Sequence, residues 1–594
     1  MCGIVGYIGN KKAKPIIFNC LAKLEYRGYD SCGVAIDDVG LKLYKDAFRV
    51  DVMSKKTPPL DGMVGIGHTR WATCGEPSMA NAHPHSDCTG NIAVVHNGII
   101  SNFQELRREL IKEGHHFSSE TDTEVIPHLI EKYYKGNLEE AIESALHDIE
   151  GSYAIVVIRA GEPKLVVAKK DCPLIIGVGD QESFIASDVP AILEYTNRVI
   201  YLEEGDIGVI TGSDIKIKRN GSDINVEEHK VSWSVEAAQK AGYEHFMLKE
   251  IHEQPRVVRD TLAGYCKNAE PIIDLEWIRD AGIEDMLILA CGTSYNAGLV
   301  GKYIFEELLR IPVRVELASE FNYYPHTLAK TMAVVITQSG ETADVIKAAR
   351  RLQEVGCRVL AITNVVGSTV SRLANQTIYT SAGPEISVAS TKSFMAQLVL
   401  LYWMVMSYSR ADIKRLADML EKIRQLPNKV QQVLDNKSSI KKRGRYLSDY
   451  NNVLFIGRGI NYPIALEGAL KLKEISYIHA EGYAAGELKH GPFALLSKDT
   501  PVVAIVAKDN TFDAMITNIR EIKTRGAPVI ALSEDENGAV SEVADFIITV
   551  PKVDAIFSPV VNTVAVQLLA YYTAKERGCL IDFPRNLAKS VTVE

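Results

Sequence analysis

Met1-Cys2-Gly3-Ile4-Val5-Gly6 places a cysteine directly after a methionine and ahead of an apolar, strand-like run. If Met1 is removed, the α-amine of Cys2 lies beside its own thiol. That amine has a pKa of about 7.7–8.0, so it can accept a proton at neutral pH and activate the thiol as a nucleophile. The alternative is that Cys2 is an ordinary residue of a frayed terminus. The rest of the sequence decides between the two.

Length and composition predict a multidomain globular protein. The chain has 594 residues, of which 46% are hydrophobic and 24% charged. One core does not serve that length, so about three or four domains are expected. The net charge of −9 argues against a nucleic-acid partner, because neutralising phosphates requires a basic surface. The ten cysteines include no Cys-x-x-Cys pair, which argues against a structural zinc site and favours a reducing compartment.

The sequence predicts a cytoplasmic protein with no membrane partner. No charged, apolar, cleavable leader precedes Cys2. The most apolar stretch, residues 394–408, contains Gln397 and is shorter than the roughly 20 residues that a bilayer requires. We expect this stretch to form a buried helix.

Short strands and polar helices alternate over residues 2–232, which we predict to be the first domain. Strand-like runs lie at 63–67, 92–96, 154–158 and 165–168, and helical patterns at 102–113 and 123–134. Several consecutive short strands with amphipathic helices predict layered sheets flanked by helices.

Three polar clusters interrupt these strands. Arg70, at a strand end in His-Thr-Arg-Trp-Ala-Thr, is suited to holding a carboxylate with two parallel hydrogen bonds. Asn97 and Gly98 could supply the two donors of an oxyanion hole. Asp122, in Ser-Glu-Thr-Asp-Thr-Glu, could hold a substrate amine. Each has an ordinary alternative, namely a surface ion pair, a turn and a helix cap.

Together with Cys2-Gly3-Ile4-Val5-Gly6 and Tyr26-Arg27-Gly28-Tyr29-Asp30-Ser31, these clusters resemble the N-terminal-nucleophile (class II) glutamine amidotransferases. The resemblance implies an αββα fold in which Cys2 attacks the glutamine amide and its α-amine relays the proton. Asn97 and Gly98 would stabilise the oxyanion. One departure is Cys74, which stands where that family often has a histidine. The glutamine-binding residues that the resemblance implies are Arg70, Trp71, Thr73, His83, Asn97, Gly98 and Asp122.

The second half of the chain is predicted to be a duplicated α/β fold. A polar linker with a docking helix, residues 233–252, precedes it, and we expect that helix to stop at Pro255. From 285 to 363, fully apolar strands alternate with helices, which predicts a parallel sheet covered on both faces. The same pattern returns about 165 residues later, as expected for two copies of one doubly wound fold.

Hydroxyl-rich junctions between strands and helices predict one phosphate site in the first copy. Hydroxyls and free N–H groups at helix N-termini suit a phosphate, and no Walker motif implies a nucleoside triphosphate. Simple helix capping is the alternative for any one junction. The junctions are Thr293-Ser294, Thr337-Gln338-Ser339 with Thr342, and residues 387–393.

The second copy carries the candidate groups for carbon chemistry. Glu467, Lys471 and Glu474 share one helix face, although such spacing usually marks a surface salt-bridge face. His490 lies in a glycine-bracketed loop suited to moving over a substrate. Lys589 lies in a C-terminal tail that would ordinarily be solvated.

These segments resemble the sugar-isomerase (SIS) family. The resemblance implies two flavodoxin-like SIS domains at 253–425 and 436–580 and a tail, 581–594, that enters the sugar site. His490 would open the hexose ring, from its own or a neighbouring subunit, and Lys589 would form a Schiff base with C2. Glu474 would move a proton from C1 to C2, while Lys471 stabilises the developing charge. The sugar-phosphate-binding residues implied are Thr293, Ser294, Thr337, Gln338, Ser339, Thr342, Val388 and Ser390.

An amidotransferase domain before two SIS domains implies L-glutamine and fructose 6-phosphate as substrates. Ammonia would pass between the two sites, with Trp71 and Tyr29 as the channel gate. The same resemblance implies a homodimer that needs no metal and no organic cofactor. Two alternatives stay open: an amidotransferase that makes phosphoribosylamine, for which we find no acidic phosphoribosyltransferase motif, and a sugar-phosphate-sensing protein with an idle hydrolase.

Overall fold

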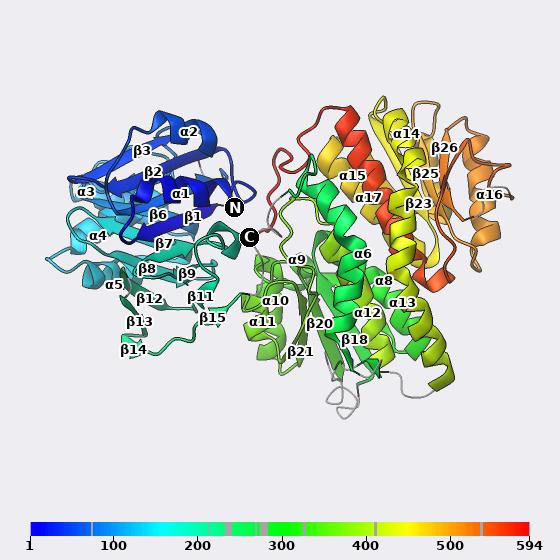
Figure 1. Ribbon diagram of the computed structural model, residues 1–594, viewed down its shortest axis with the longest axis horizontal. Coiled ribbons are helices and arrows are strands. Elements are labelled where there is room, and N and C mark those ends of the chain that lie inside the picture. The colour runs from blue at the N-terminus through cyan, green and yellow to red at the C-terminus, as the bar shows by residue number, and fades with distance from the viewer. Residues whose placement is uncertain are drawn as a thin grey trace. The chain divides into compact units, whose positions relative to one another are not determined.

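The chain divides into two compact units (Figure 1). The first comprises residues 1–238 with 341–343 and 590–594, and the second comprises 239–340 and 344–589. The computed structural model describes residues 2–72, 75–212, 214–231, 240–267, 270–271, 273, 283–324, 328, 330–408, 413–534 and 538–592.

The first unit is built on two antiparallel sheets. The eight-stranded sheet has the order β15-β11-β9-β10-β1-β4-β2-β3, and the seven-stranded sheet has the order β14-β13-β12-β8-β7-β6-β5. The strands of the eight-stranded sheet are β1 (Gly3–Ile8), β2 (Ser31–Asp37), β3 (Leu41–Asp46), β4 (Val64–Arg70), β9 (Ile175–Val178), β10 (Ser183–Ala186), β11 (Arg198–Tyr201) and β15 (His229–Lys230). Those of the seven-stranded sheet are β5 (His85–Ser86), β6 (Ile92–Ile100), β7 (Gly151–Arg159), β8 (Leu165–Lys170), β12 (Asp206–Thr211), β13 (Asp214–Arg219) and β14 (Ser222–Ile224).

Two apolar cores make this unit a four-layered structure. Successive strand residues point to opposite faces, so Val95 joins the core between the sheets while Val94 faces the helices outside. The eight-stranded sheet is covered by α1, whose Ile17 packs against Gly67 of β4. The αββα fold class is therefore confirmed. The helices are α1 (Ala13–Ala22), α2 (Val50–Lys56), α3 (Phe103–Lys112), α4 (Val125–Tyr133) and α5 (Leu138–Asp148), with the 3-10 helices η1 (Asp122–Glu124) and η2 (Val189–Ala191).

The second unit contains two five-stranded parallel sheets of the same topology. Their orders are β19-β18-β20-β21-β22 and β24-β23-β25-β26-β27, which is 2-1-3-4-5 in each copy. This is the flavodoxin-like order, so the predicted duplication is confirmed. The strands are β18 (Asp285–Ala290), β19 (Val313–Leu317), β20 (Thr331–Ile336), β21 (Val359–Thr363) and β22 (Gln376–Tyr379), then β23 (Asn452–Gly457), β24 (His479–Ala484), β25 (Val502–Val506), β26 (Val529–Ser533) and β27 (Phe546–Thr549). A two-stranded ribbon, β16 (Cys266–Lys267) and β17 (Glu270–Pro271), lies outside them.

Long helices join the two copies through one shared core. The apolar stretch 394–408 lies in α12 and is buried through Met406, as the sequence predicts. Among the residues that the structure describes, one segment, Ala555–Glu576, is long and apolar enough to span a bilayer, yet 89% of its most apolar window is buried, which is typical of a core helix. The helices of this unit are α6 (Phe246–Gly264), α8 (Gly292–Leu309), α9 (Ala318–Phe321), α10 (Ala343–Glu354), α11 (Thr369–Leu373), α12 (Lys392–Tyr408), α13 (Ile413–Asp435), α14 (Lys437–Leu447), α15 (Tyr462–Ser476), α16 (Phe512–Lys523) and α17 (Ser558–Glu576), with the 3-10 helices η4 (Gly459–Asn461), η5 (Ala485–His490), η6 (Pro492–Leu495) and η7 (Ala555–Phe557).

The prediction that the docking helix stops at Pro255 is wrong, because α6 continues through this residue to Gly264. Proline lacks the N–H that would bond to the carbonyl of Ile251. The side chain of Gln254 takes that place, since its Nε2 donates to Ile251 O at 3.1 Å. Pro255 is buried where α6 packs against α12 and α13, so tertiary packing supports the helix through the proline.

Candidate active sites

Cys2 lies where three segments of the first unit converge. β1 pairs with β4 so that Gly3 is opposite Thr69, which brings Trp71, just past β4, to the thiol. The backbone N–H of Trp71 donates to Cys2 Sγ at 3.3 Å. The Cys2 carbonyl accepts from Asn97 Nδ2 at 3.0 Å and from Arg27 Nε at 3.2 Å. The cysteine is thus held by groups distant in sequence, which a frayed terminus would not be.

Asn97 has one fixed orientation. Its Oδ1 lies 3.0 Å from His68 Nε2, and that nitrogen also lies 3.1 Å from the carbonyl of His96. Two acceptors around one nitrogen place the imidazole proton on Nε2, so Oδ1 accepts and the NH2 group of Asn97 faces Cys2 and Ser187 Oγ. The amide therefore presents its donors at the backbone of Cys2, as an oxyanion hole beside this residue requires.

Gly98 occupies a position that only glycine fits. Its φ is 135°, and a Cβ built there would lie 2.0 Å from the carbonyl oxygen of Ser152 on the neighbouring strand. This close approach lets β6 turn its backbone beside Asn97 without losing its pairing with β7.

The predicted glutamine-binding residues that the structure describes lie on several different elements of the first unit. Arg70 is 4% exposed, and its Nη2 donates to Gly75 O at 3.0 Å. Asp122, in η1, accepts from Ile100 N at 2.9 Å, which ties it to the strand that carries Asn97. His83 stacks on His68 with ring centroids 4.1 Å apart. Thr73 and Cys74 lie outside the described residues.

The loop that carries the predicted gate residue Tyr29 braces the nucleophile. Arg27 donates to the Cys2 carbonyl and, through Nη1, to Asp188 Oδ2 at 3.1 Å. Asp30 accepts from Ala72 N at 2.9 Å, beside the other gate residue, Trp71. The ring of Tyr29 lies under the Arg49 guanidinium, 5.2 Å away.

Ser187 and Asp188 contact the candidate site residues Asn97 and Arg27, which the sequence did not reveal. Ser187 Oγ accepts from Asn97 and, at 2.7 Å, from Ile4 N. Both residues directly follow β10, which pairs with β1. The segment carries no motif, so only the strand pairing shows their role.

Four buried histidines lie on or next to β4, β5 and β6. Burial lowers the pKa of His68 to about 3, and the pKa values of His83 and His85 well below the usual range, because a buried imidazolium loses its hydration. Burial also lowers the pKa of His96. The fold therefore holds these rings neutral at physiological pH.

In the second unit, α8 of the first copy and α15 of the second meet through polar side chains. Thr293, in the first turn of α8, donates to Glu467 Oε1 at 3.1 Å and accepts from Lys471 Nζ at 3.0 Å. Ser294 accepts from Gln397 Nε2 of α12 at 3.0 Å. One predicted sugar-binding hydroxyl thus touches the predicted charge-stabilising lysine.

The residues on α15 form a buried ionic cluster rather than a surface face. Lys471 and Glu467 are both 0% exposed. Lys471 Nζ lies 2.6 Å from Glu474 Oε2 and 3.5 Å from Glu467 Oε1. Burial raises the pKa of Glu467 to about 7. Burial alone would lower the pKa of Lys471, but the charges of Glu474 and Glu467 outweigh it and raise that pKa.

The side chain of Lys589 is buried rather than solvated. Lys589 Nζ lies 2.5 Å from Glu385 Oε2, and both side chains are buried. Asp582 accepts hydrogen bonds from the first two N–H groups of α6, and its own carbonyl accepts from Val388 N at 3.0 Å. These contacts explain how a near-terminal lysine is held in place.

Glu385 is a further residue that the sequence analysis missed. Its carboxylate accepts from Ser390 Oγ, from Thr391 N and from both the backbone and side chain of Ser393. Burial would raise the pKa of Glu385, but Lys589 and these donors hold it at about 2. Residues of the hydroxyl-rich segment 387–393 therefore donate hydrogen bonds to the carboxylate of Glu385, an anionic group within the protein.

The remaining predicted residues are those of the turn after β20 in the first copy and His490 in the second copy. Thr337 directly follows β20, and its Oγ1 accepts from Gly340 N at 3.3 Å; Gln338 and Ser339 lie in the same turn, ahead of Thr342 and α10. His490 lies on η5 of the second copy and is exposed, and among the described residues no hydrogen bond or ion pair joins its side chain to Lys471, Glu474 or Lys589. Lys589 also lies outside the α15 cluster, since its side chain pairs with Glu385.

Comparison with known proteins identifies the domain families of both units. A family model described as a glutamine amidotransferase domain matches residues 68–194, and one described as a SIS domain matches residues 281–407 and 446–577. The chain is 48% identical, over all of its length and all of theirs, to curated proteins of Caldanaerobacter subterraneus and Thermococcus kodakarensis, each named glutamine–fructose-6-phosphate aminotransferase (isomerizing).

Among solved structures, the second unit is similar to the C-terminal domain of glucosamine-fructose-6-phosphate aminotransferase from Francisella tularensis. The TM-score is 0.55 with 38% identity, covering 58% of this chain and all of that one. The fold and sites thus define a glutamine amidotransferase joined to two SIS domains. With full-length relatives at 48% identity, the chain belongs to the isomerising glutamine–fructose-6-phosphate aminotransferase family.

Proposed function

We propose that the protein converts L-glutamine and fructose 6-phosphate into L-glutamate and glucosamine 6-phosphate, the first step of hexosamine synthesis. The observation that carries this proposal is the contact of Thr293 with Lys471 and Glu467, because it joins a hydroxyl at a helix N-terminus to a buried acid–base cluster. Such a site suits a phosphorylated sugar whose carbon-bound protons must move. Full-length relatives carrying that enzyme name support it.

In the first unit, the Cys2 thiolate attacks the glutamine amide carbon. The oxyanion then accepts hydrogen bonds from Asn97 Nδ2 and from the Gly98 N–H. Both N–H groups of Asn97 are engaged in this structure, with Cys2 O and Ser187 Oγ, so one of these bonds is exchanged for the oxyanion. Ammonia leaves with the proton relayed by the α-amine of Cys2, and water hydrolyses the thioester to release glutamate and the thiol.

Glutamine is held at its two charged ends. Arg70 binds the α-carboxylate and Asp122 the α-ammonium, with Trp71, Thr73 and His83 completing the pocket. The support is chemical: a buried guanidinium and a buried carboxylate match a zwitterion.

In the second unit, Lys589 forms a Schiff base with C2 of the open-chain ketose and releases water. Ammonia then displaces the lysine at C2, and Glu474 transfers a proton from C1 to C2. Lys471, which is charged and in contact with Glu474, stabilises the negative charge that develops between these steps. Ser294, Thr337, Gln338, Ser339, Thr342, Val388 and Ser390, with Thr293, bind the phosphate and the sugar hydroxyls.

The same proposal includes the domain boundaries, the ammonia channel and the oligomeric state of the protein. We assign an amidotransferase domain at 2–232, a linker at 233–252, SIS domains at 253–425 and 436–580, and a tail at 581–594. Ammonia passes between the two sites with Trp71 and Tyr29 as its gate. The protein is a cytoplasmic homodimer in which the partner subunit supplies the histidine equivalent to His490, consistent with the exposure of His490 in its own subunit.

Formation of glucosamine 6-phosphate from glutamine and fructose 6-phosphate tests the function. Lys589→Arg keeps the charge opposite Glu385 but removes the primary amine that forms a Schiff base. It should lower synthesis at least about 100-fold while glutamine hydrolysis at Cys2 survives. Borohydride with fructose 6-phosphate should trap an adduct on the wild-type enzyme at Lys589. Binding of the sugar without any amino sugar formed would favour the sensing alternative instead.

A further inference from the structure

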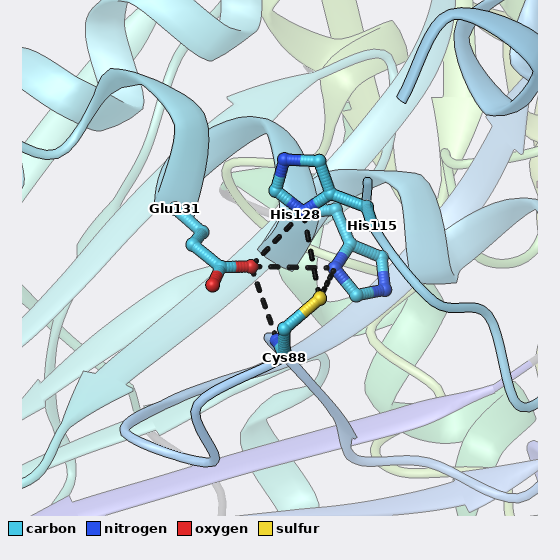
Figure 2. Close-up of side chains that lie close together, drawn as sticks. All are labelled: Cys88, His115, His128 and Glu131. Carbon is cyan, nitrogen blue, oxygen red and sulfur yellow. Dashed lines mark hydrogen bonds and ion pairs between the residues drawn. The ribbon is translucent and has the colours of Figure 1, made fainter. Parts of the chain in front are cut away.

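Four potential metal ligands meet in the first unit, outside the residues assigned to glutamine hydrolysis (Figure 2). Cys88 lies in the loop between β5 and β6, and His115 follows α3. His128 and Glu131 are one turn apart on α4. Their ligand atoms all lie within 4.8 Å of one another. Three separate segments thus converge on one point.

Four of the six separations between these ligand atoms are close to those of a tetrahedral zinc site. Cys88 Sγ lies 3.5 Å from His115 Nδ1 and 3.5 Å from His128 Nδ1. Glu131 Oε2 lies 3.1 Å and 3.5 Å from the same two nitrogens. Zinc bonds of about 2.3 Å to sulfur and 2.0–2.1 Å to nitrogen or oxygen, at tetrahedral angles, separate S from N by about 3.6 Å and N from O by about 3.3 Å. These four separations, of the six edges of a tetrahedron, lie within about 0.2 Å of those values.

We propose that Cys88, His115, His128 and Glu131 bind one Zn²⁺ ion. Binding requires the Cys88 thiolate, so the thiol proton is released to solvent. One thiolate and one carboxylate then balance the two charges of the ion. A sulfur and two imidazoles select zinc over magnesium or calcium, which prefer oxygen ligands. Four protein ligands fill the tetrahedron, so the site is structural rather than catalytic.

The surroundings of His128 agree with a ligand role. Its side chain is 1% exposed, with Nδ1 toward Cys88 and Glu131. On the opposite side, Nε2 lies 4.0 Å from Glu124 Oε1 and has no hydrogen-bond partner among the described atoms. Zinc-bound histidines usually direct their second ring nitrogen at a carboxylate in this way. Glu131 Oε2 also accepts from Cys88 N at 3.1 Å, which fixes the loop over α4.

The ion would crosslink the elements that position the glutamine site. α4 begins directly after η1, which carries Asp122, and the Cys88 loop leads into β6, which carries Asn97 and Gly98. Zinc there would link the Cys88 loop and the segment after α3 to α4, and it would not contact the thiol of Cys2. The absence of any Cys-x-x-Cys pair, which argued against a zinc site, does not bear on ligands spread over 88–131.

Cobalt substitution tests the proposal independently of activity. The full-length protein, without a polyhistidine tag, is treated with chelator, dialysed and titrated with Co²⁺ and then Zn²⁺. We expect one equivalent of Co²⁺ to give the visible d–d bands of tetrahedral cobalt and a near-ultraviolet thiolate band, both abolished by Zn²⁺. Zinc should also raise the melting temperature.

Cys88→Ala and His115→Ala should each lose the cobalt spectrum and the thermal shift. His116→Ala, which changes an exposed neighbour outside the cluster, should keep both. Both ligand variants alter side chains that are at least partly exposed, so circular dichroism can verify that they fold. A wild-type protein without the thiolate band, or a Cys88→Ala variant that keeps it, would overturn the assignment.

Discussion

Lys589 Nζ lies 2.5 Å from Glu385 Oε2 inside the second unit, with both side chains buried. This pair joins the C-terminal tail to the segment that precedes α12. Glu385 also binds Ser390 and Ser393, two of the hydroxyls in the segment assigned to the sugar. The proposed Schiff-base lysine is therefore held in a buried ion pair, and sugar binding must reorganise the same network.

Glu385→Gln should loosen the tail and impair synthesis. Removing one partner of a buried ion pair leaves an uncompensated charge and costs about 3–5 kcal/mol, which exposure of the tail relieves. We expect faster tryptic cleavage at Lys589 and at least about tenfold slower glucosamine 6-phosphate formation, with glutamine hydrolysis kept. Glu542→Gln, at an exposed position of the same unit, is the control. A tail as protected as in the wild type would argue against this role of the pair.

Gly98→Ala should damage the first unit more than the same change at Gly136. Both glycines have positive φ, 135° and 99°, and the strain of that backbone conformation alone costs about 1–3 kcal/mol. At Gly98 a Cβ would also lie 2.0 Å from Ser152 O, whereas at Gly136 nothing lies within 4 Å. We expect a larger fall in melting temperature and loss of glutamine hydrolysis for Gly98→Ala alone. Equal effects of the two substitutions would contradict the close approach seen here.

Asn97→Ala should lower glutamine hydrolysis about 10²–10³-fold, the usual effect of removing one oxyanion donor. The loss should appear in kcat rather than in KM, because the bond forms only as the oxyanion develops. Arg27→Lys, which removes the Nε donor to Cys2 O but not the positive charge, should have a smaller effect. A rise in KM with kcat unchanged would assign Asn97 to ground-state binding instead.

The buried histidines should make the first unit sensitive to acid. The pKa of His68 falls from 6.5 unfolded to about 3 folded, so below pH 6.5 the unfolded state binds a proton that the folded state does not. The contribution of His68 to the free energy of unfolding is fully present above pH 6.5. Below pH 6.5 this contribution falls by about 1.4 kcal/mol per pH unit. Urea unfolding at pH 7.5, 6.5 and 5.5 measures the loss, and His68→Gln should make the slope shallower. His116→Gln, at an exposed position, should leave it unchanged.

Most of the fold could be predicted because its signals are local. The strands of the second unit are apolar throughout, so their alternation with helices indicated a parallel sheet, and the two copies share one strand order. The prediction at Pro255 was wrong because the backbone hydrogen bond that proline removes is replaced by one from the side chain of Gln254. Helix propensities do not include such a replacement.

The candidate sites were predictable only where motifs carry them. Asn97 and Lys471 lie in recognisable segments, whereas Ser187 and Glu385 act across long sequence distances and carry no pattern of their own. Ser187 reaches Asn97 because β10 pairs with β1, and Glu385 reaches Lys589 because Asp582 anchors the tail on α6. The four proposed zinc ligands were missed for the same reason.

Transfer of labelled nitrogen tests the central claim most directly. The enzyme is given glutamine labelled with ¹⁵N at the amide and fructose 6-phosphate, in a buffer with excess unlabelled ammonium, and the glucosamine 6-phosphate is analysed by mass spectrometry. Because ammonia released at Cys2 is proposed to pass within the protein, the product should keep the ¹⁵N label despite the unlabelled pool. A hexosamine carrying only ¹⁴N, or no hexosamine at all, would contradict the account.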